Sequence, residues 1–539
     1  MLGRILAAAV LLAAVLSCTG SHAESKGPAP CVASQFATAS SAEIMAGRVS
    51  FVGLPAVPVG KDVDWRMDPH RNRSWALTFH SLRWMGRLVV DYETTGREAY
   101  LERATEIARD WVRDNPRGGR GVSEWAWADH PVALRTPALV CLSRHVGDRW
   151  LADSLAEHAD YLADPRLYKK GHNHGLDQDL ALAAAGCRLS NTRWRDLAAR
   201  RMAESAELAI DRQGVLQEQA PRYAIYVHER LGLAFDTMRT CGSAVPARLA
   251  ERRASLAEYI AQSTQPDGRL APIGDSPADL RPRGYPHSAD RVKVFDAGYV
   301  YGRTAWDDPG SAYYSIRFGP GRKMHGHEDH LGVTYHADRR DILVEAGFHS
   351  YEKSAYPKWT VTPEAHNVPV VDGRAFREGT ATRLTRTAIG VKRQFFDLED
   401  TAYGVSRTRK VLVNHGADLM AVRDAVKDGA RLRTLWHFAP GLRVTANRGG
   451  TVVLADGAWR VTLTQFALPS CRPLGGQSVR RGEISPGYLK RVPSATVVSR
   501  PARSVLTVIV PGTGDPRAVT CADGVVTART PDGPVSFAA

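Results

Sequence analysis

The chain has 539 residues, more than one hydrophobic core usually serves, so we expect at least two domains. Its hydrophobic content of 44% is ordinary for a globular protein and excludes a largely disordered chain. The 71 Lys and Arg residues exceed the 57 Asp and Glu residues, and the formal net charge of +14 favours a polyanionic partner. Because the basic residues are dispersed rather than gathered in a block, the sequence predicts no nucleic-acid site.

Residues 1–23 have the pattern of a secretory signal peptide. Arg4 precedes an apolar run from Ile5 to Leu16, and the small residues that follow suit cleavage after Ala23. The stretch "VLSC" also resembles a bacterial lipoprotein box, so a lipid anchor on Cys18 is the alternative. Both interpretations predict a protein that is secreted, extracellular or held in the cell envelope. No later apolar run is long enough to cross a bilayer, so we expect no transmembrane segment.

The cysteines agree with an oxidising compartment. Removing a signal that contains Cys18 leaves six of the seven, an even number. Cys471 with Cys521, and one pair among the cysteines of the helical region, are compatible disulfides, although the sequence leaves the partners open.

Residues 24–290 carry helical periodicity, from about Arg73 to Gln265. In the run from Arg73 to Tyr92, apolar residues including Trp75 recur at three- and four-residue steps, and we assign Trp75 to the core. Six later runs behave similarly, and glycine-containing turns such as "NPRGG" and "QPDGR" are followed by extended polar segments. This rhythm of helix pairs predicts an incomplete α/α toroid of helical hairpins.

Residues 291–539 change to a strand pattern. Short alternating runs rich in Val, Thr, Tyr and Phe are separated by Gly, Asp and Asn about every 10–15 residues. This pattern predicts an antiparallel β-sandwich that follows the helical domain, with the junction near residues 275–295. A ligand site at this junction would draw on both domains.

Two motifs in the helical half carry candidate site residues. Asn173 and His174 precede an apolar helix in "KKGHNHGLDQDL", where an amide and an imidazole can donate hydrogen bonds to a carboxylate. Alternatively, Asn173 only caps the helix and His174 is solvated. Tyr223 in "QEQAPRYAIY" could act as an acid or base near a cation, or it could simply pack.

A third motif opens the strand half. His325 and His327 in "HGHEDH" precede a predicted strand, and alternation would direct both side chains to one face. Glu345 and His366 lie on neighbouring strand runs, and imidazoles with a carboxylate satisfy the ligand needs of Zn²⁺. The alternative is a set of solvated or hydrogen-bonded histidines.

A substrate groove is suggested by residues after the first glycine turn. Trp125 and Trp127 in "EWAWADH" could stack on sugars, and Arg135 in "HPVALRT" could bind a carboxylate or sulfate. Helix packing explains the same residues equally well.

The four motifs "HNHGLDQDLAL", "QEQAPRY", "HGHEDHLGVTYHADRRDILVEAG" and "EAHNVPVVDG", in this order, resemble the heparinase II/III-like polysaccharide lyases. The resemblance covers about residues 65 to 400 closely and implies an α/α toroid followed by a β-sandwich. It also implies a lyase, a carbon–oxygen lyase that cleaves a uronate-containing acidic polysaccharide by β-elimination and leaves a 4,5-unsaturated uronate end.

The resemblance assigns roles residue by residue. Asn173 and His174 match the pair that neutralises the uronate carboxylate, and Tyr223 and His325 match an acid–base pair facing each other across the domain cleft. The positions of a structural zinc in some members match His327, Glu345 and His366. Two departures are that Glu345 replaces the usual Asp, and that His172 replaces an Asn before Asn173, which would alter the substrate subsite.

Rival functions belong to other classes. An α/α-barrel glycoside hydrolase would need two carboxylates flanking the bond; Asp177, Asp179 and Glu218 are available, but nothing in the sequence pairs them. A zinc hydrolase using His325, His327 and His366 lacks a supporting HExxH helix. A secreted, non-catalytic protein that binds acidic polysaccharides would explain the basic charge equally well.

Overall fold

The computed structural model describes residues 39–539. The predicted signal peptide, its cleavage point at Ala23, and Cys18 lie outside the described residues. Within the described part, none of the helices combines the length and the apolar character needed to cross a bilayer.

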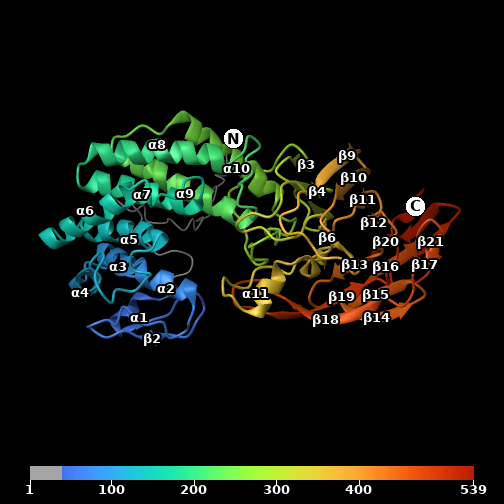
Figure 1. Ribbon diagram of the computed structural model, residues 1–539, viewed down its shortest axis with the longest axis horizontal. Helices are drawn as coiled ribbons and strands as arrows, with labels where there is room; N and C mark the ends of the chain where they lie inside the picture. Colours follow the sequence, from blue (N-terminus) through green and yellow to red (C-terminus); the bar gives the residue numbers. More distant parts are fainter. Residues whose placement is uncertain (1–38) are drawn as a thin grey trace, which may run out of the picture.

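Helices make up the first domain, as the periodicity predicts. They lie side by side at one end of the molecule (Figure 1). In chain order they are α1 (Ser41–Met45), α2 (Arg73–His80), α3 (Gly86–Thr95), α4 (Glu98–Asp114), α5 (Asp129–Leu142), α6 (Arg149–Ala163), α7 (Asn173–Arg188), α8 (Thr192–Ala209), α9 (Pro221–Thr240) and α10 (Ala247–Gln262), with a short hairpin of β1 (Arg48–Val49) and β2 (Val57–Pro58) after α1.

Helix α7 lies at the centre of the helical domain and is buried almost throughout. It packs against α5, α8 and α9. Its alanine-rich sequence allows these neighbours to approach closely, and Gly186 lies where a Cβ would meet Arg195 and Asn191 at 3.0–3.1 Å. The position of α7 matters because its first residues, Asn173 and His174, belong to the candidate site.

The periodicity of the run from Arg73 to Tyr92 predicted a single helix, but the structure divides this run into two helices. Leu82 takes a left-handed conformation (φ 50°) and separates α2 from α3. Trp84 donates its indole N–H to the carbonyl of Phe79 at 3.0 Å, and Phe79 also stacks on Trp75. Packing of these buried aromatic rings therefore breaks a segment whose spacing favours a continuous helix. Trp75 is fully buried, which confirms its assignment to the core.

Strands form the second domain. They are β3 (Val292–Phe295), β4 (Tyr299–Arg303), β5 (Tyr313–Arg317), β6 (Val333–Ala337), β7 (Arg340–Leu343), β8 (Pro369–Val371), β9 (Arg383–Ile389), β10 (Arg393–Asp400), β11 (Arg407–Asn414), β12 (Leu419–Val426), β13 (Leu432–His437), β14 (Arg443–Arg448), β15 (Thr451–Asp456), β16 (Trp459–Ala467), β17 (Arg472–Pro473), β18 (Ser478–Ile484), β19 (Val492–Val498), β20 (Ser504–Pro511), β21 (Val519–Ala522), β22 (Val525–Thr530) and β23 (Gly533–Ala538), with helix α11 (Ala355–Thr360) and the turn η1 (Pro363–Ala365) between β7 and β8.

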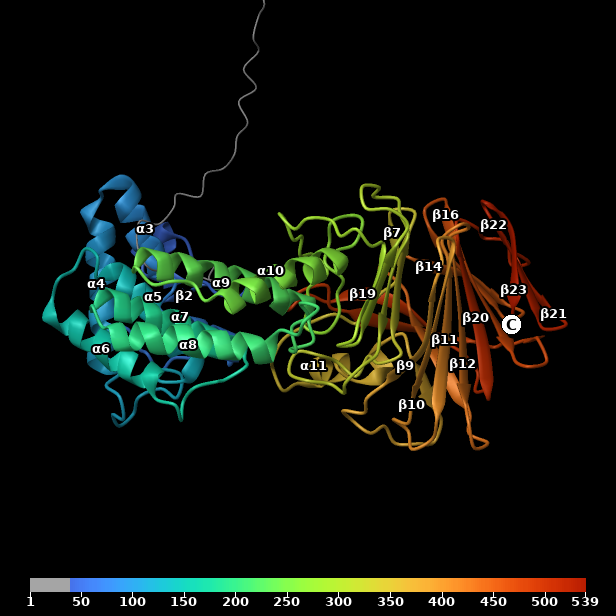
Figure 2. The same ribbon diagram turned by 90° about the horizontal axis from the view of Figure 1, so that it is seen from above.

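These strands pair antiparallel into stacked sheets. A nine-stranded sheet runs in the order β14-β15-β16-β20-β12-β11-β10-β9, with β17 beside β16. The sheets β3-β4-β5-β6-β7 and β18-β19-β13-β8 share a hydrophobic core with it, and the sheet β21-β22-β23 contributes to a second core with it. Figure 2 shows the resulting layers, with the helices at one end and β22 and β23 at the other.

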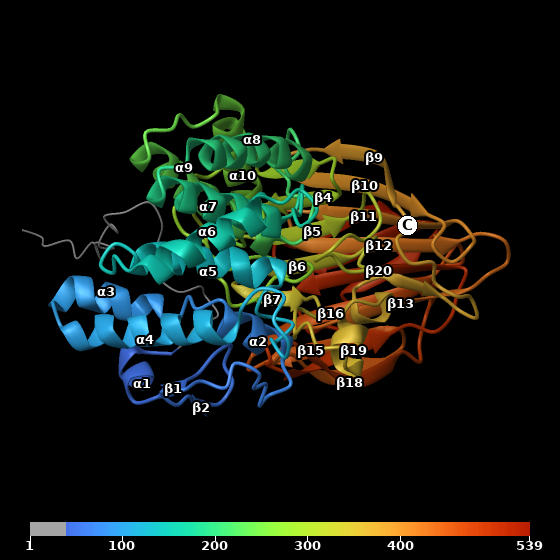
Figure 3. The same cartoon turned by 60° about the vertical axis from the view of Figure 1, so that its left-hand side comes forward.

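The two domains share a hydrophobic core. The ring of Tyr259 on α10 lies 5.4 Å from the rings of Phe295 and Tyr299, and these residues belong to one buried cluster with side chains of α8 and α9. Figure 3 shows the ends of the helices against the strands β4 to β7. The helical and sandwich domains are therefore packed together, and loops from both meet at their junction.

Both predicted disulfides are confirmed. Cys187 bonds to Cys241 in the helical domain, and Cys471 bonds to Cys521 in the sandwich.

Candidate active site at the domain junction

Asn173, at the start of α7, is held by a carboxylate from the loop before α9. Its backbone N–H donates to Glu218 Oε1 at 2.7 Å, and its side-chain Nδ2 donates to Glu218 Oε2 at 2.5 Å. The alternative that Asn173 caps the helix is wrong, because His172 is the cap and its Nδ1 accepts the N–H of His174. The second N–H of the Asn173 amide is therefore available to another acceptor.

His174 is fixed from two sides. Its Nδ1 lies 3.1 Å from Asp129 Oδ2, and its ring stacks on His130 with 3.8 Å between centroids. Burial opposes ionisation of Asp129, but the hydrogen bond from His174 holds the pKa of this carboxyl below its usual range. A carboxylate can only accept a hydrogen bond, so His174 Nδ1 carries the hydrogen and Nε2 is directed away from Asp129.

His130 connects this pair to a buried ion pair. Its Nε2 lies 2.9 Å from Asp177, which also receives hydrogen bonds from Arg230 and Tyr226 at 2.6 Å each. Burial lowers the pKa of His130 to about 4, so its ring is neutral near pH 7. Burial likewise lowers the pKa of His172 to about 3. The two imidazoles that flank His174 are thus neutral near pH 7.

Tyr223 and His325 face each other across the junction, one from α9 and the other from the sandwich. Their rings stack with 3.5 Å between centroids and 9° between planes. The Tyr223 hydroxyl hydrogen-bonds the hydroxyl of Tyr351, which also lies 3.3 Å from His325 Nδ1. Burial raises the pKa of Tyr223 and of Tyr351 above the usual value, so both phenols keep their protons at neutral pH. The sequence thus places Tyr223 and His325 correctly next to each other.

Asp275, in the linker between the domains, orients both histidines of the "HGH" motif. Its Oδ2 lies 2.8 Å from His325 Nδ1, its Oδ1 lies 3.2 Å from His327 Nε2, and its backbone N–H donates to the carbonyl of His325 at 2.9 Å. Gly274 is required before it, because the backbone has φ 57° and a Cβ would lie 2.5 Å from the carbonyl oxygen of His325. His325 therefore carries a hydrogen on Nδ1, and its Nε2 lies 3.5 Å from Glu218 Oε2.

Two family models match most of the chain. The family models described as Heparinase II/III N-terminus and Heparinase II/III-like, C-terminal match residues 36–296 and 289–522. The chain belongs to the heparinase II/III-like family.

Sequence relatives in the heparinase II/III-like family are distant. A heparin-sulfate lyase of Bacteroides thetaiotaomicron is 24% identical over 223 residues, which cover 38% of this chain and 31% of that protein. A heparin-sulfate lyase of Pedobacter heparinus is 28% identical over 81 residues, which cover 15% of this chain and 12% of that protein. The matched segments thus span about a third or less of these relatives.

Solved structures match more of the chain. A heparinase III crystal structure has a TM-score of 0.76 at 17% identity, covering 89% of this chain and 86% of that chain. A heparan sulfate lyase of Pedobacter heparinus has a TM-score of 0.67 at 15% identity, covering 93% and 88%. At such identities the likeness concerns the fold, and it confirms the predicted helical domain followed by an antiparallel sandwich.

Of the heparinase II/III-like motif residues of the sandwich, His325 and His327 precede a strand as predicted, whereas Glu345 and His366 lie in loops and not on strands as predicted. His325 and His327 precede β6, Glu345 follows β7, and His366 follows η1. Loops allow these side chains to converge on contacts that strand alternation would not provide.

Two of the three predicted zinc ligands have the chemistry of metal-binding imidazoles. His327 gives one ring nitrogen to Asp275 and His366 gives Nδ1 to Glu345, while His327 Nδ1 and His366 Nε2 are buried without a hydrogen-bond partner. Metal-bound histidines commonly donate their other N–H to a carboxylate in this way. Their rings lie 5.3 Å apart.

Glu345 contacts one of these imidazoles through a hydrogen bond. Its Oε2 is taken by His366, and within residues 39–539 the one set of three donor atoms within 4.8 Å of one another is Asp62, Asp110 and Asp114, far from the motif in sequence. The two imidazoles thus fit a metal, with Glu345 as the hydrogen-bond partner of His366 and Asp275 as that of His327. We assign no step of catalysis to a metal.

The predicted groove residues serve mainly as packing. Arg135 is fully buried and donates to His158 and to the carbonyls of His80 and Ala126 at 2.7–2.9 Å, so the prediction that it contacts substrate is wrong. Trp127 is half-buried and donates its N–H to the carbonyl of Asn115 at 2.9 Å. The packing alternative describes these two residues better.

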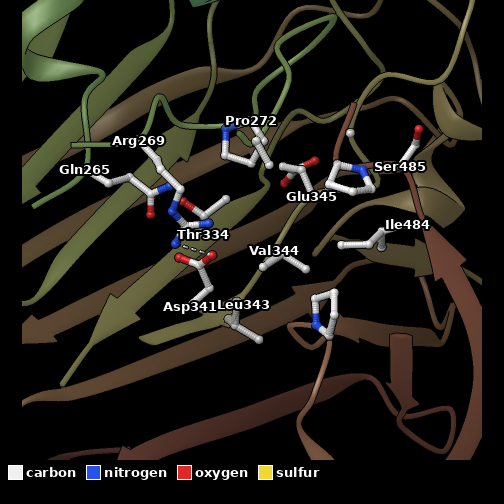
Figure 4. A pocket seen from close by; sticks show the side chains of 14 residues that line it. Gln265, Arg269, Pro272, Thr334, Asp341, Leu343, Val344, Glu345, Ile484 and Ser485 are labelled. Carbon is white, nitrogen blue, oxygen red and sulfur yellow. Dashed lines mark ion pairs between the residues drawn. The ribbon is translucent and has the colours of Figure 1, made fainter. Parts of the chain in front are cut away.

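A cavity of about 110 Å³ lies beside Glu345, between the linker and the sandwich. Figure 4 shows the Glu345 carboxylate near Pro272 and the ion pair of Arg269 with Asp341, at 2.8 Å, on another wall. The charged groups that line this cavity are largely paired. We therefore assign no ligand to the cavity and regard it as space for solvent beside Glu345.

Proposed function

We propose that this protein is a polysaccharide lyase that cleaves a uronate-containing acidic polysaccharide by β-elimination. The observation that carries the proposal is the stack of Tyr223 on His325, bridged by Tyr351, between the two domains. Membership of the heparinase II/III-like family and the net charge of +14 support an anionic sugar polymer as substrate.

In this proposal the helical domain neutralises the uronate carboxylate. The proton at C5 is weakly acidic, and the developing enolate-like charge needs preorganised donors. Asn173 supplies the N–H that Glu218 leaves free, and His174 supplies Nε2 in its protonated form, for which the Asp129 carboxylate provides a counter-charge. Both donors are held in place before substrate binds, so little reorganisation is needed.

The proton transfers are assigned to His325 and Tyr223. Since Asp275 holds the hydrogen on His325 Nδ1, Nε2 can accept the C5 proton as the base. Tyr223 keeps its proton because burial raises its pKa, so it can donate that proton to the glycosidic oxygen as it leaves C4. Tyr351, hydrogen-bonded to Tyr223, can return a proton to it.

The hydrolase alternative finds less support. Asp177 is bound by Arg230 and Tyr226, Asp179 by Arg201 and Tyr168, and Glu218 by Asn173. These three carboxylates are committed to buried partners rather than flanking an open bond-cleaving position. A non-catalytic binding protein would retain the donors without needing the stacked acid–base pair.

The test is an ultraviolet absorbance assay for unsaturated uronate over a panel of acidic polysaccharides. A rise with one polymer supports the lyase and names the substrate. New reducing ends without absorbance would instead establish a hydrolase, and binding without either product would establish the binding protein.

Zinc binding by the sandwich is a separate part of the proposal. The unpartnered His327 Nδ1 and His366 Nε2 support it, with Glu345 holding His366 as a hydrogen-bond partner. We expect bound zinc in metal analysis of the purified protein, and an affinity about 10–100-fold weaker in Glu345→Gln. A parent protein without zinc, even after incubation with the ion, would contradict it.

Location outside the cytoplasm is also proposed. The disulfides Cys187–Cys241 and Cys471–Cys521 support an oxidising compartment. Mass spectrometry of the mature protein would distinguish a chain that starts after Ala23 from one that carries a lipid on Cys18.

A further inference from the structure

The two domains also touch through the loop between β18 and β19, which contacts the linker at Ala278 and Asp279 and reaches α2 beyond it. Asn72, the cap of α2 in the helical domain, exchanges hydrogen bonds with Tyr488 in the loop between β18 and β19: the distance from the Tyr488 hydroxyl is 3.2 Å to both Nδ2 and Oδ1 of Asn72. Beside it, the backbone N–H of Arg73 donates to Glu352 Oε1 of the sandwich at 3.0 Å. These residues are separated by 416 and 279 positions in the chain, so the contact is purely tertiary.

The four residues are well suited to hold the domains together reversibly. Asn72 is buried, and the Tyr488 ring packs on the hydrophobic core of the helical domain. Glu352 places a carboxylate at the N-terminus of α2, where unpaired N–H groups and the helix dipole favour a negative charge. Polar contacts of this kind are individually weak in water and can break without unfolding either domain.

Backbone strain occurs on both sides of the contact. Arg71, next to Asn72, has φ 47°, and Leu489, next to Tyr488, has φ 56°. Residues other than glycine adopt this left-handed region at a cost, and such strain is concentrated at functional positions. In both loops the strained residue thus directly adjoins the residue that makes the contact.

Two chains of contacts run from the reaction centre to this second contact. On the sandwich side, Tyr351 lies 4.8 Å from Phe348 and Phe348 lies 6.0 Å from Tyr488, measured between ring centroids. On the helical side, His174 stacks on His130 at the start of α5, and the loop before α5 carries Trp125, over which Arg73 lies at 5.9 Å. Figure 1 shows α2 at the side of the helical domain that faces α11.

A polymer that reaches both His174 and His325 would lie between these two chains of contacts. On one side it would meet the linker contacts, where Gln219 Oε1 accepts the N–H of Lys323 at 2.6 Å and Asp275 binds His325. On the other side it would meet the contact of Asn72 and Arg73 with Tyr488 and Glu352. Protein would then surround the polymer on all sides.

We propose that Asn72, Arg73, Glu352 and Tyr488 form a clasp that closes the domains around the polysaccharide, so that the enzyme acts preferentially from chain ends. This inference rests on the proposed lyase function. A chain end can be threaded past a closed clasp, whereas an internal stretch requires it to open. With two or three hydrogen bonds, each worth about a factor of 2 to 10, closure is favoured by about 4- to 1,000-fold. Internal stretches would thus find access only during brief openings.

The test compares the parent with Tyr488→Phe/Glu352→Ala, which removes the clasp contacts but leaves the Asn72 cap and the catalytic residues intact. Polymer mass is followed by size-exclusion chromatography with light scattering, against ultraviolet absorbance of the product. In the parent we expect absorbance to rise while polymer mass falls slowly; in the double variant, mass falls several-fold more at equal absorbance. Lys490→Ala is the matched control, since Lys490 in the same loop pairs with Asp279 of the linker at 3.0 Å.

If the parent is active and its curve of polymer mass against absorbance coincides with that of the double variant, the clasp is overturned and the proposed lyase function is not. A parent that forms no unsaturated ends with any polymer would overturn the proposed function. Hydrogen exchange then still decides whether the clasp exists: residues 71–75 and 485–490 should exchange faster in the double variant than in the parent and the Lys490→Ala control. Equal exchange would mean that these contacts do not hold the domains.

Discussion

Tyr223 is the side chain whose removal tests the proposed chemistry most directly. In Tyr223→Phe the ring still stacks on His325, but the proton donor is lost. We expect kcat to fall by about 10²- to 10⁴-fold with little change in KM, since general acid catalysis contributes on this order. The measurement is the ultraviolet assay, with Tyr285→Phe as a control because Tyr285 contacts His228 away from this stack. An unchanged kcat would exclude Tyr223 as the acid.

Asp275 acts through His325 and is a positioning residue. An amide in Asp275→Asn cannot accept hydrogen bonds from His325 and His327 in the same way, so His325 would lose its preference for hydrogen on Nδ1. We expect kcat to fall about 10–100-fold, the usual size for such partners, with KM nearly unchanged. Asp290→Asn, an exposed linker aspartate paired with Lys293, should retain parent activity. Equal losses in both variants would contradict the assignment.

Buried histidines set the acid limit of stability. Burial lowers the pKa of His80 to about 3 and of His130 to about 4, below their value in the unfolded chain. The unfolded chain therefore binds more protons, and the free energy of unfolding should decrease as pH falls from about 6.5 to about 4, by about 1.4 kcal/mol per pH unit for each histidine. Thermal melting across this range measures it, and His80→Gln should flatten the dependence. A melting temperature constant from pH 7 to 5 would refute it.

At the scale of elements, the linker that carries Asp275 fixes how the domains meet. Gly274 has φ 57°, and a Cβ there would press on the carbonyl oxygen of His325. Gly274→Ala should therefore destabilise the protein by about 1–3 kcal/mol and displace His325, with loss of activity. Gly284→Ala is the matched control, because Gly284 has φ 80° but its Cβ would meet nothing within 4 Å. Unfolding by urea, with the activity assay, distinguishes the two: equal effects would show that backbone strain alone is responsible.

The sequence predicts elements and motif residues better than it predicts their partners. Helical and alternating periodicities act locally, so the helical domain and the sandwich were predictable. Cys471 with Cys521 was named as a compatible disulfide, but the partners in the helical domain, Cys187 and Cys241, were left open. The proximity of Tyr223 and His325 followed from family resemblance. Asp275, Asp129 and His130 were missed because their partners are 44 to 52 residues away in the chain. A Gly–Asp pair in a linker was the available signal for Asp275.

Errors arose where packing overrides spacing. The break at Leu82 follows from the packing of Trp84 on Phe79, and Arg135 is buried because three acceptors inside the helical domain take its donors. A lone arginine on a helix gives no sign of such acceptors. Glu345 accepts a hydrogen bond from His366, and residue types alone do not distinguish a metal ligand from the hydrogen-bond partner of a ligand.

At the scale of the whole molecule, the net charge of +14 should govern association with a polyanion. We expect kcat/KM to fall about tenfold or more between low and high salt, because dissolved ions reduce the range over which the basic protein attracts a polyanion. The activity assay over a salt series measures this, and kcat at saturating substrate should change much less. A kcat/KM independent of salt would contradict an electrostatic contribution to binding.

The exposed segment after Asp275 has a consequence for the lifetime of the enzyme. The donors proposed to neutralise charge come from one domain and the proposed base from the other, while residues such as Arg283 and Arg291 lie exposed between them. One proteolytic cut there would remove the covalent link between Asp275 and the sandwich, and the buried core that the two domains share would be left to hold them together. The lifetime of the proposed activity under proteolysis would then depend on how firmly that shared core keeps Asp275 against His325.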